Sequence, residues 1–171
     1  STDEFLKNLK SAAGDYNTYA VLFSDITLYG VGSNATADNN VILNLNGHTI
    51  DRDLSGLELD GEVICVDEKA DLIINDGTIT GGFSENGAGG IHIKEGANVT
   101  LNNVNIVGNR ASDDDGAGIA VYKGATLTMN GGSFKDNLAD VELGSIYAVQ
   151  GSAVYVENGT AIFDGVTFES N

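Results

Sequence analysis

The chain of 171 residues is poor in cysteine, in basic residues and in long apolar runs. Cys65 is its single cysteine, so no internal disulfide can form. Lys and Arg number 8 against 25 Asp and Glu, and the formal charge of −17 would repel nucleic acid and anionic membranes. No run of 18 apolar residues is present, which predicts no membrane-spanning helix. We therefore expect neither a nucleic-acid partner nor membrane insertion.

Proline and tryptophan are also absent, whereas glycine is abundant, with 23 residues. The apolar stretches are rich in Ile, Val and Thr, the residue types that favour β-strands. Glycine-rich polar segments separate these stretches, as tight turns require. The composition predicts an all-β chain, and the length is that of one domain.

A repeated pattern organises the sequence. The segment from Gly90 to Asn109 recurs 28 residues later, from Gly118 to Asn137. A fixed period of about 20 to 50 residues indicates a solenoid or another repeat architecture. Alignment on the apolar residue that closes each copy extends the pattern to five copies. These closing residues are Ile50, Ile79, Ile106, Phe134 and Phe168.

Further columns of equivalent residues support the alignment. Four residues before the closing position stand Asn46, Asn75, Asn102, Asn130 and Asp164. Three residues after it stand Asp53, Gly82, Asn109, Asn137 and Asn171. The upstream apolar pairs are Ile64/Val66, Ile91/Ile93, Ile119/Val121 and Val154/Val156. Apolar residues alternate with polar ones within each copy, which predicts short strands.

Stacking such copies in parallel, about 4.8 Å apart, places equivalent side chains directly above each other. The apolar columns then form the core, and the first Asn column forms a ladder of side-chain amides. The sequence therefore predicts a right-handed single-stranded parallel β-helix of about five to six rungs. A β-sandwich with regularly spaced strands is the alternative fold.

Residues 1–14 differ from the repeats. Ser1 and Glu4 fit a capping box, and Phe5, Leu6 and Leu9 lie on one helical face. We predict a capping α-helix over residues 1–14 and a parallel β-helix over residues 15–171. The last coil shows no cap of its own, so we expect either a longer β-helix or end-to-end self-association.

The connections after the closing positions vary most, and all of them leave the coil at the same corner. They cover residues 83–89, 110–117 and 138–151. Variable loops on a rigid scaffold are common binding surfaces. The predicted ligand-binding residues are Arg110, Asp113, Asp114, Asp115, Ile146 and Tyr147. Extra strand or packing within the coil is the alternative role of these connections.

Metal binding is a separate hypothesis. Asn109, Asp113 and Asp115 could supply oxygen ligands to Ca²⁺, although three consecutive acids often form only a solvated turn. No other cofactor is predicted.

The sequence assigns no catalytic residue. Arg110 lies beside three acids, but β-helix enzymes present their groups from several rungs on one sheet face. Cys65 and His92 fall in one column that should face outward, and an inert thiol is the expected state of Cys65. We expect a structural role for His48, which stands in a turn column.

Two motifs resemble a known repeat type. Gly89-Gly90-Ile91 and Phe134-Lys135-Asp136-Asn137 resemble the Gly-Gly-x-Ile and Phe-x-x-Asn elements of polymorphic outer-membrane-protein-type repeats. The rung from Leu43 to Ile50 is similar to first rungs of pectate-lyase-like β-helix proteins from bacterial surfaces.

The resemblance implies a secreted or bacterial cell-surface protein that acts as a non-enzymatic adhesion or binding module. Its ligand would be a host glycoprotein or a polysaccharide. Because this fold hosts many functions, two alternatives stay open. One is a polysaccharide-active lyase or glycoside hydrolase, or its inactive remnant, and the other is a purely structural stalk.

Overall fold

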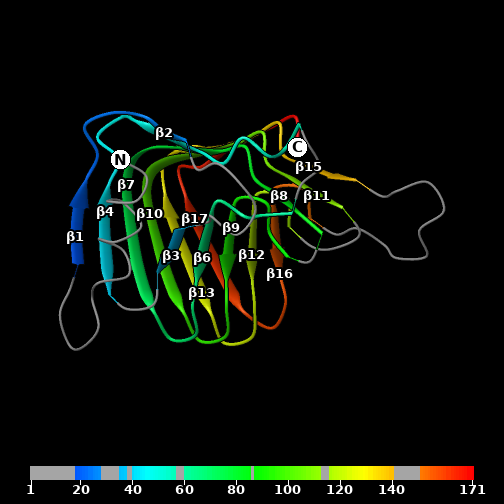
Figure 1. Ribbon diagram of the computed structural model, residues 1–171. Coiled ribbons are helices and arrows are strands. Elements are labelled where there is room, and N and C mark those ends of the chain that lie inside the picture. Colours follow the sequence, from blue (N-terminus) through cyan, green and yellow to red (C-terminus); the bar gives the residue numbers. More distant parts are fainter. Residues whose placement is uncertain are drawn as a thin grey trace.

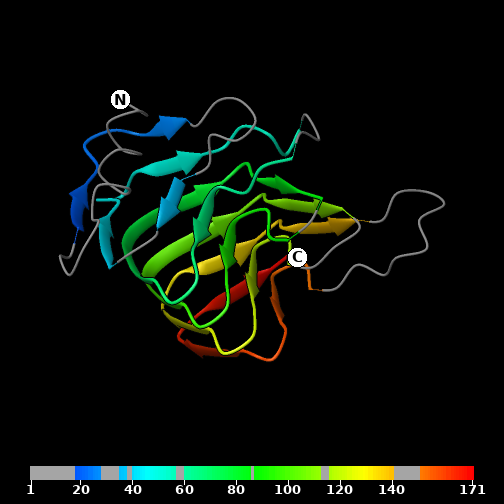
Figure 2. The same ribbon diagram turned by 60° about the horizontal axis from the view of Figure 1, so that its bottom comes forward.

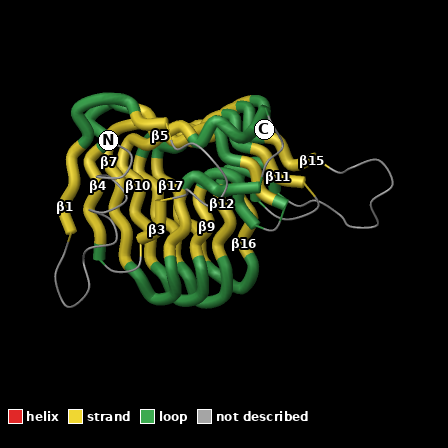
Figure 3. The backbone as a smooth tube through the Cα atoms, in the orientation of Figure 1, coloured by secondary structure: helices red, strands yellow, loops and turns green. Residues whose placement is uncertain are grey.

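The computed structural model describes residues 18–27, 35–37, 40–56, 60–85, 87–112, 116–140 and 151–171. Every regular element in these ranges is a β-strand, and the strands stack in parallel into a solenoid with three walls (Figure 1, Figure 3). The predicted helix over residues 1–14 lies outside the described residues. Within the described ranges, no helix is long and apolar enough to cross a membrane.

The first wall is a parallel sheet of ten strands. Its two longest strands, β7 (Asp71–Thr80) and β10 (Asn98–Val107), each run the full width of the wall. In the other coils a turn divides the same path into two strands. The divided strands are β1 (Thr18–Val21) and β2 (Ile26–Thr27), β4 (Val41–Asn44) and β5 (Thr49–Asp51), β13 (Thr126–Asn130) and β14 (Ser133–Lys135), and β17 (Thr160–Asp164) and β18 (Thr167–Glu169).

Two smaller sheets form the other walls (Figure 2). The second wall stacks β3 (Ala35–Ala37), β6 (Ile64–Val66), β9 (Ile91–Ile93), β12 (Ile119–Val121) and β16 (Val154–Val156). The third wall stacks β8 (Phe83–Ser84), β11 (Arg110–Ser112) and β15 (Leu138–Asp140). Since the third wall has only three strands, the solenoid has about three complete turns, fewer than the predicted rungs.

The strand register confirms the closing column of the alignment. Ile50 pairs with Ile79, Ile79 with Ile106, and the column continues through Phe134 to Phe168. The first four of these side chains are completely buried. Together with the equally aligned apolar pairs of the second wall, they build one continuous core between the sheets.

The alignment of the first copy is wrong by two residues before its closing position. Asn44, not Asn46, pairs with Asn75, whereas Ile50 still pairs with Ile79. The turn between β4 and β5 absorbs the difference, because Asn46 and Gly47 adopt positive φ angles of 53° and 81°. The buried side chain of Leu45 then packs against the next coil at Gly77, where a side chain would clash with it.

The predicted asparagine ladder is present on the outer face of the first wall. The Nδ2 of Asn102 donates to Oδ1 of Asn75 at 2.8 Å, and the Nδ2 of Asn130 donates to Oδ1 of Asn102 at 2.9 Å. Both bonds link adjacent coils. The ladder therefore runs along the stack and helps to hold the parallel register.

A second ladder lies inside the protein, at the corner between the first and third walls. Asn109 and Asn137 are almost fully buried. Asn109 Oδ1 accepts from the backbone N–H of Gly82 at 3.1 Å, and Asn137 Oδ1 accepts from the backbone N–H of Asn109 at 3.2 Å. Asn171 Oδ1 accepts from Asn137 in the same way at 3.2 Å. Each asparagine side chain thus accepts a hydrogen bond from a backbone N–H at the corner of the preceding coil. The sequence alignment alone did not reveal this second ladder.

Candidate functional site

The third wall carries the corner where the sequence predicts binding. Arg110 in β11 pairs with Phe83 in β8 and with Leu138 in β15. Ser112 and Asp140, the last residues of β11 and β15, are also register partners. The ends of β11 and β15 therefore lie at adjacent positions on two neighbouring coils. Figure 1 shows both strands at one edge of the solenoid.

Arg110 holds this corner together. Its Nη1 donates to the backbone carbonyl of Ser55 at 3.0 Å, and its Nη2 lies 3.7 Å from Oδ2 of Asp140. The guanidinium carbon also lies 5.9 Å from the centre of the Phe83 ring, in cation–π geometry. With 26% of its side chain exposed, Arg110 braces the start of the two segments more than it projects into solvent.

The other predicted ligand-binding residues, Asp113, Asp114, Asp115, Ile146 and Tyr147, lie outside the described residues. The same holds for Asp113 and Asp115 in the Ca²⁺ hypothesis, which therefore stays a prediction. Its third ligand, Asn109, is completely buried and bonds to Gly82. Among the described residues, no cluster of three or more His, Cys, Asp or Glu side chains could hold a metal ion.

The column expected to face outward on the second wall is partly covered. Cys65 pairs with His92, and His92 with Ala120, as predicted. Cys65 and Ala120 are nevertheless buried, and Gly116, which precedes β12, lies against Ala120. Desolvation of the thiol is the main cause that raises the pKa of Cys65 to about 11. Burial and the raised pKa of Cys65 agree with the expected inert thiol.

His92 contacts aromatic rings that the sequence analysis missed. Its ring centre lies 5.0 Å from that of Tyr122, and Tyr122 lies 6.2 Å from Tyr155. The three half-buried rings come from three successive coils, so only the register brings them together. Their planes are tilted by 42° and 68°, and they form no flat stacking platform.

His48 has structural contacts. Its Nδ1 lies 3.3 Å from Oδ1 of Asp25. The backbone carbonyl of His48 accepts from the N–H of Thr78 in the next coil. These contacts agree with the structural role expected for it.

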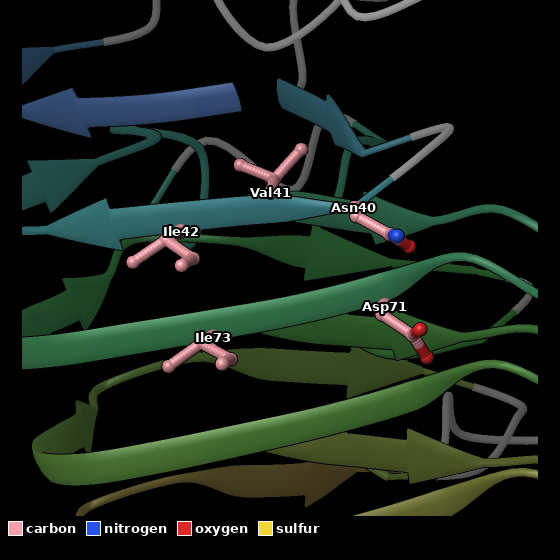
Figure 4. Close-up of a pocket in the computed structure, with 5 residues that line it drawn as sticks. All are labelled: Asn40, Val41, Ile42, Asp71 and Ile73. Carbon is pink, nitrogen blue, oxygen red and sulfur yellow. The ribbon is translucent and has the colours of Figure 1, made fainter. Parts of the chain in front are cut away.

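A shallow depression of about 190 Å³ lies on the outer face of the first wall (Figure 4). Ile42 and Ile73, partners on adjacent strands, form its apolar floor, and Asn40 and Asp71 lie at its rim. Pockets that enclose a drug-sized ligand usually measure about 300–1,000 Å³. The depression could contact one small apolar group flanked by a hydrogen-bonding group, but it is too small to enclose a drug-sized ligand. It was missed because the first copy was aligned with the wrong register.

Comparisons with known proteins give no relative. No protein-family description, no curated protein and no solved structure matches this chain. We therefore infer a function from the geometry of the solenoid and from the motifs of the sequence.

Proposed function

We propose that this protein is a non-enzymatic binding or adhesion module that presents loops from one edge of a β-helix. The observation that carries the proposal is the third wall. There Ser112 and Asp140, the last residues of β11 and β15, are register partners, and Arg110 ties the wall to Ser55 and Asp140. A rigid edge from which two adjacent variable segments begin is a common design for recognition surfaces.

The setting we propose is a secreted or bacterial cell-surface protein with a right-handed β-helix. Support comes from Gly89-Gly90-Ile91 and Phe134-Lys135-Asp136-Asn137, which resemble elements of polymorphic outer-membrane-protein-type repeats. The rung from Leu43 to Ile50 is similar to first rungs of pectate-lyase-like proteins. The buried ladder gives the last motif a physical reason, because Asn137 and Asn171 bond to neighbouring coils. The proposed ligand is a host glycoprotein or a polysaccharide, and the formal charge of −17 disfavours strongly acidic ligands.

An enzymatic role is the second candidate, and Arg110 was its one base close to carboxylates in sequence. The guanidinium of Arg110 contacts a backbone carbonyl, a carboxylate and an aromatic ring of the scaffold. Those contacts favour bracing over proton abstraction, because a catalytic base must reach the substrate. A structural stalk is the third candidate, and it predicts no ligand at all.

One finer feature of the fold also belongs to this proposal, the capping helix over residues 1–14. Ca²⁺ bound through Asn109, Asp113 and Asp115 is an additional hypothesis. It predicts that calcium raises the unfolding temperature and that Asp113→Asn together with Asp115→Asn removes the increase.

The test is a binding screen of the full chain against glycan arrays and host extracellular proteins, combined with activity assays. The assays follow the ultraviolet absorbance of unsaturated products from uronate polymers, and the release of reducing sugars. We expect a bound ligand and no turnover. Turnover without any bound ligand would contradict the proposal. If turnover occurs and Arg110→Ala leaves it unchanged, Arg110 is also excluded as the base.

A further inference from the structure

A row of outward-facing side chains crosses the first wall along the stacking direction. We call it the central row, and its members in β4, β7, β10 and β13 are register partners from coil to coil. They are Ile42, Ile73, Thr100 and Thr128. Each is half-buried and stands between two buried residues of its strand, so its side chain points away from the core. The central row therefore presents two isoleucine side chains and then two threonine side chains on the outer face.

Hydrogen-bonding side chains border the central row on both sides. Two residues before it in each coil stand Asn40, Asp71, Asn98 and Thr126, which we call the first polar row. Two residues after it stand Asn44, Asn75, Asn102 and Asn130, which we call the second polar row. At Ile42 and Ile73 the surface is hollowed into the depression of about 190 Å³, with Asn40 and Asp71 at its rim (Figure 4). The outer face thus combines an apolar centre with polar groups along both edges.

Hydrogen bonds between coils hold both polar rows in place. In the first polar row, Nδ2 of Asn98 donates to Oδ1 of Asp71 at 2.8 Å. In the second polar row, the asparagine ladder joins Asn75, Asn102 and Asn130 at 2.8 Å and 2.9 Å. These side chains are therefore ordered before a ligand arrives. Ordered groups lose less conformational entropy on binding, so the surface is preorganised.

The three rows carry little charge. Residues 98–102 and 126–130 include no charged residue, although the formal charge of the chain is −17. Asp71 is the one charged residue among the three rows. An acidic polymer would meet no basic side chain in these rows, and the rest of the protein would repel it. The surface therefore favours a neutral ligand.

The spacing of the coils restricts the ligand further. Equivalent residues of adjacent coils lie about 4.8 Å apart. A peptide strand rises about 3.3 Å per residue, so it would fall out of step with the coils, and a sheet face offers no backbone edge for it to pair with. In a straight chain of β-1,4-linked pyranoses, successive rings advance by a distance close to the coil spacing. Each ring also has apolar C–H faces and hydroxyl groups along its edges.

We propose that the first wall binds a neutral, straight, β-1,4-linked polysaccharide, with the chain lying along the central row and one sugar over each coil. The C–H faces of the sugars would contact Ile42, Ile73 and the two threonines, and their hydroxyl groups would bond to the two polar rows. The site lies on the first wall, whereas the corner at Arg110 belongs to the third wall. The inference therefore adds a second site and does not depend on the proposed function.

The first experiment is calorimetric titration of the full chain with neutral hexasaccharides of β-1,4-linked glucose, xylose and N-acetylglucosamine. We expect at least one of them to bind. For that sugar, affinity should rise from the disaccharide to the tetrasaccharide, because each added ring covers a further coil. Hexagalacturonate, which is acidic, should bind more weakly. The inference is overturned if no neutral hexasaccharide binds, if affinity does not depend on length, or if hexagalacturonate binds equally well.

The second experiment changes the central row. Thr100→Glu places a charged side chain in the path of the polysaccharide and should weaken binding of the hexasaccharide at least about tenfold. Thr78→Glu is the matched control, because Thr78 is also a half-buried, outward-facing threonine, but it pairs with Thr49 and Asn105 outside the three rows. Its affinity should equal that of the unmodified chain. Equal affinities of the two variants would show that the central row is not the site.

A change without added charge tests the same row independently. Ile73→Ala removes most of the apolar floor of the depression and should weaken binding about threefold to tenfold. Unchanged affinity of this variant also overturns the inference. Circular dichroism and the unfolding temperature of each variant check that the solenoid is folded.

A loop variant separates this site from the corner on the third wall. Replacing residues 141–150 by a short Gly-Ser turn should leave the affinity for the hexasaccharide unchanged. If this replacement abolishes binding while Thr100→Glu preserves it, the glycan binds at the corner, and the inference is wrong while the proposed function stands.

Discussion

Replacing Asn109 by leucine probes the buried ladder most sharply. Leu has a similar size but no polar atom, so the change removes the acceptor of the Gly82 N–H and the donor to the Ile79 carbonyl. A buried polar group without a partner costs about 1–3 kcal/mol, and each lost hydrogen bond contributes about 0.5–1.5 kcal/mol. We expect Asn109→Leu to lower the free energy of unfolding by about 2–5 kcal/mol, a large part of the total for a small domain.

The assay is urea unfolding followed by far-ultraviolet circular dichroism, with linear extrapolation to water. Asn130→Ala is the matched control, because Asn130 is exposed and donates one ladder bond, to Asn102 at 2.9 Å. It should change the free energy of unfolding by no more than about 0.5 kcal/mol. Equal losses in the two variants would refute the idea that the inner ladder stabilises the stack.

Further predictions concern turn geometry and pH. Gly132 has a φ of 82° and lies against the Val104 carbonyl, so Gly132→Ala should destabilise more than Gly124→Ala, where φ is 69° and no atom lies within 4 Å. Gly124→Ala is the control, and it should lower the free energy of unfolding by about 1–2 kcal/mol, because alanine is strained in a left-handed backbone. If urea unfolding shows a smaller loss for Gly132→Ala than for Gly124→Ala, the contact with the Val104 carbonyl is not destabilising. Burial raises the pKa of Cys65 from 9.0 to about 11, so the unfolded chain loses this proton at lower pH than the folded protein. Stability should therefore fall as pH rises from 9 toward 11, and Cys65→Ala should remove that component. If the stability of Cys65→Ala falls equally over this pH range, groups other than Cys65 cause the fall.

The repeat period allowed most of the scaffold to be predicted. Residues such as Ile79, Ile106 and Phe134 recur because they stack directly on one another, and stacking is a local property of each coil. The alignment of the first copy was wrong at Asn46, because a turn with positive φ angles adds residues there without changing the apolar pattern on either side. A period gives the equivalent positions, but it does not show where one coil bulges.

The candidate site was less predictable, because it depends on contacts between coils far apart in sequence. Arg110 bonds to Ser55 only because the third wall brings their segments together. The contact between His92 and Tyr122 likewise needs the parallel register. The buried position of Asn109 could have been anticipated from its recurrence at Asn137 and Asn171, since a polar residue repeated beside an apolar column indicates an internal ladder.

The most direct test of the binding-module account compares the unmodified chain with a variant in which a short Gly-Ser turn replaces residues 141–150. Both proteins are titrated with the ligand that the screen identifies, and their unfolding temperatures are measured in parallel. Our account predicts that the replacement weakens binding at least about tenfold, because the loop contributes a large part of the contact, while the unfolding temperature stays the same. Equal affinity of both proteins for that ligand would contradict the claim that this corner is the binding surface.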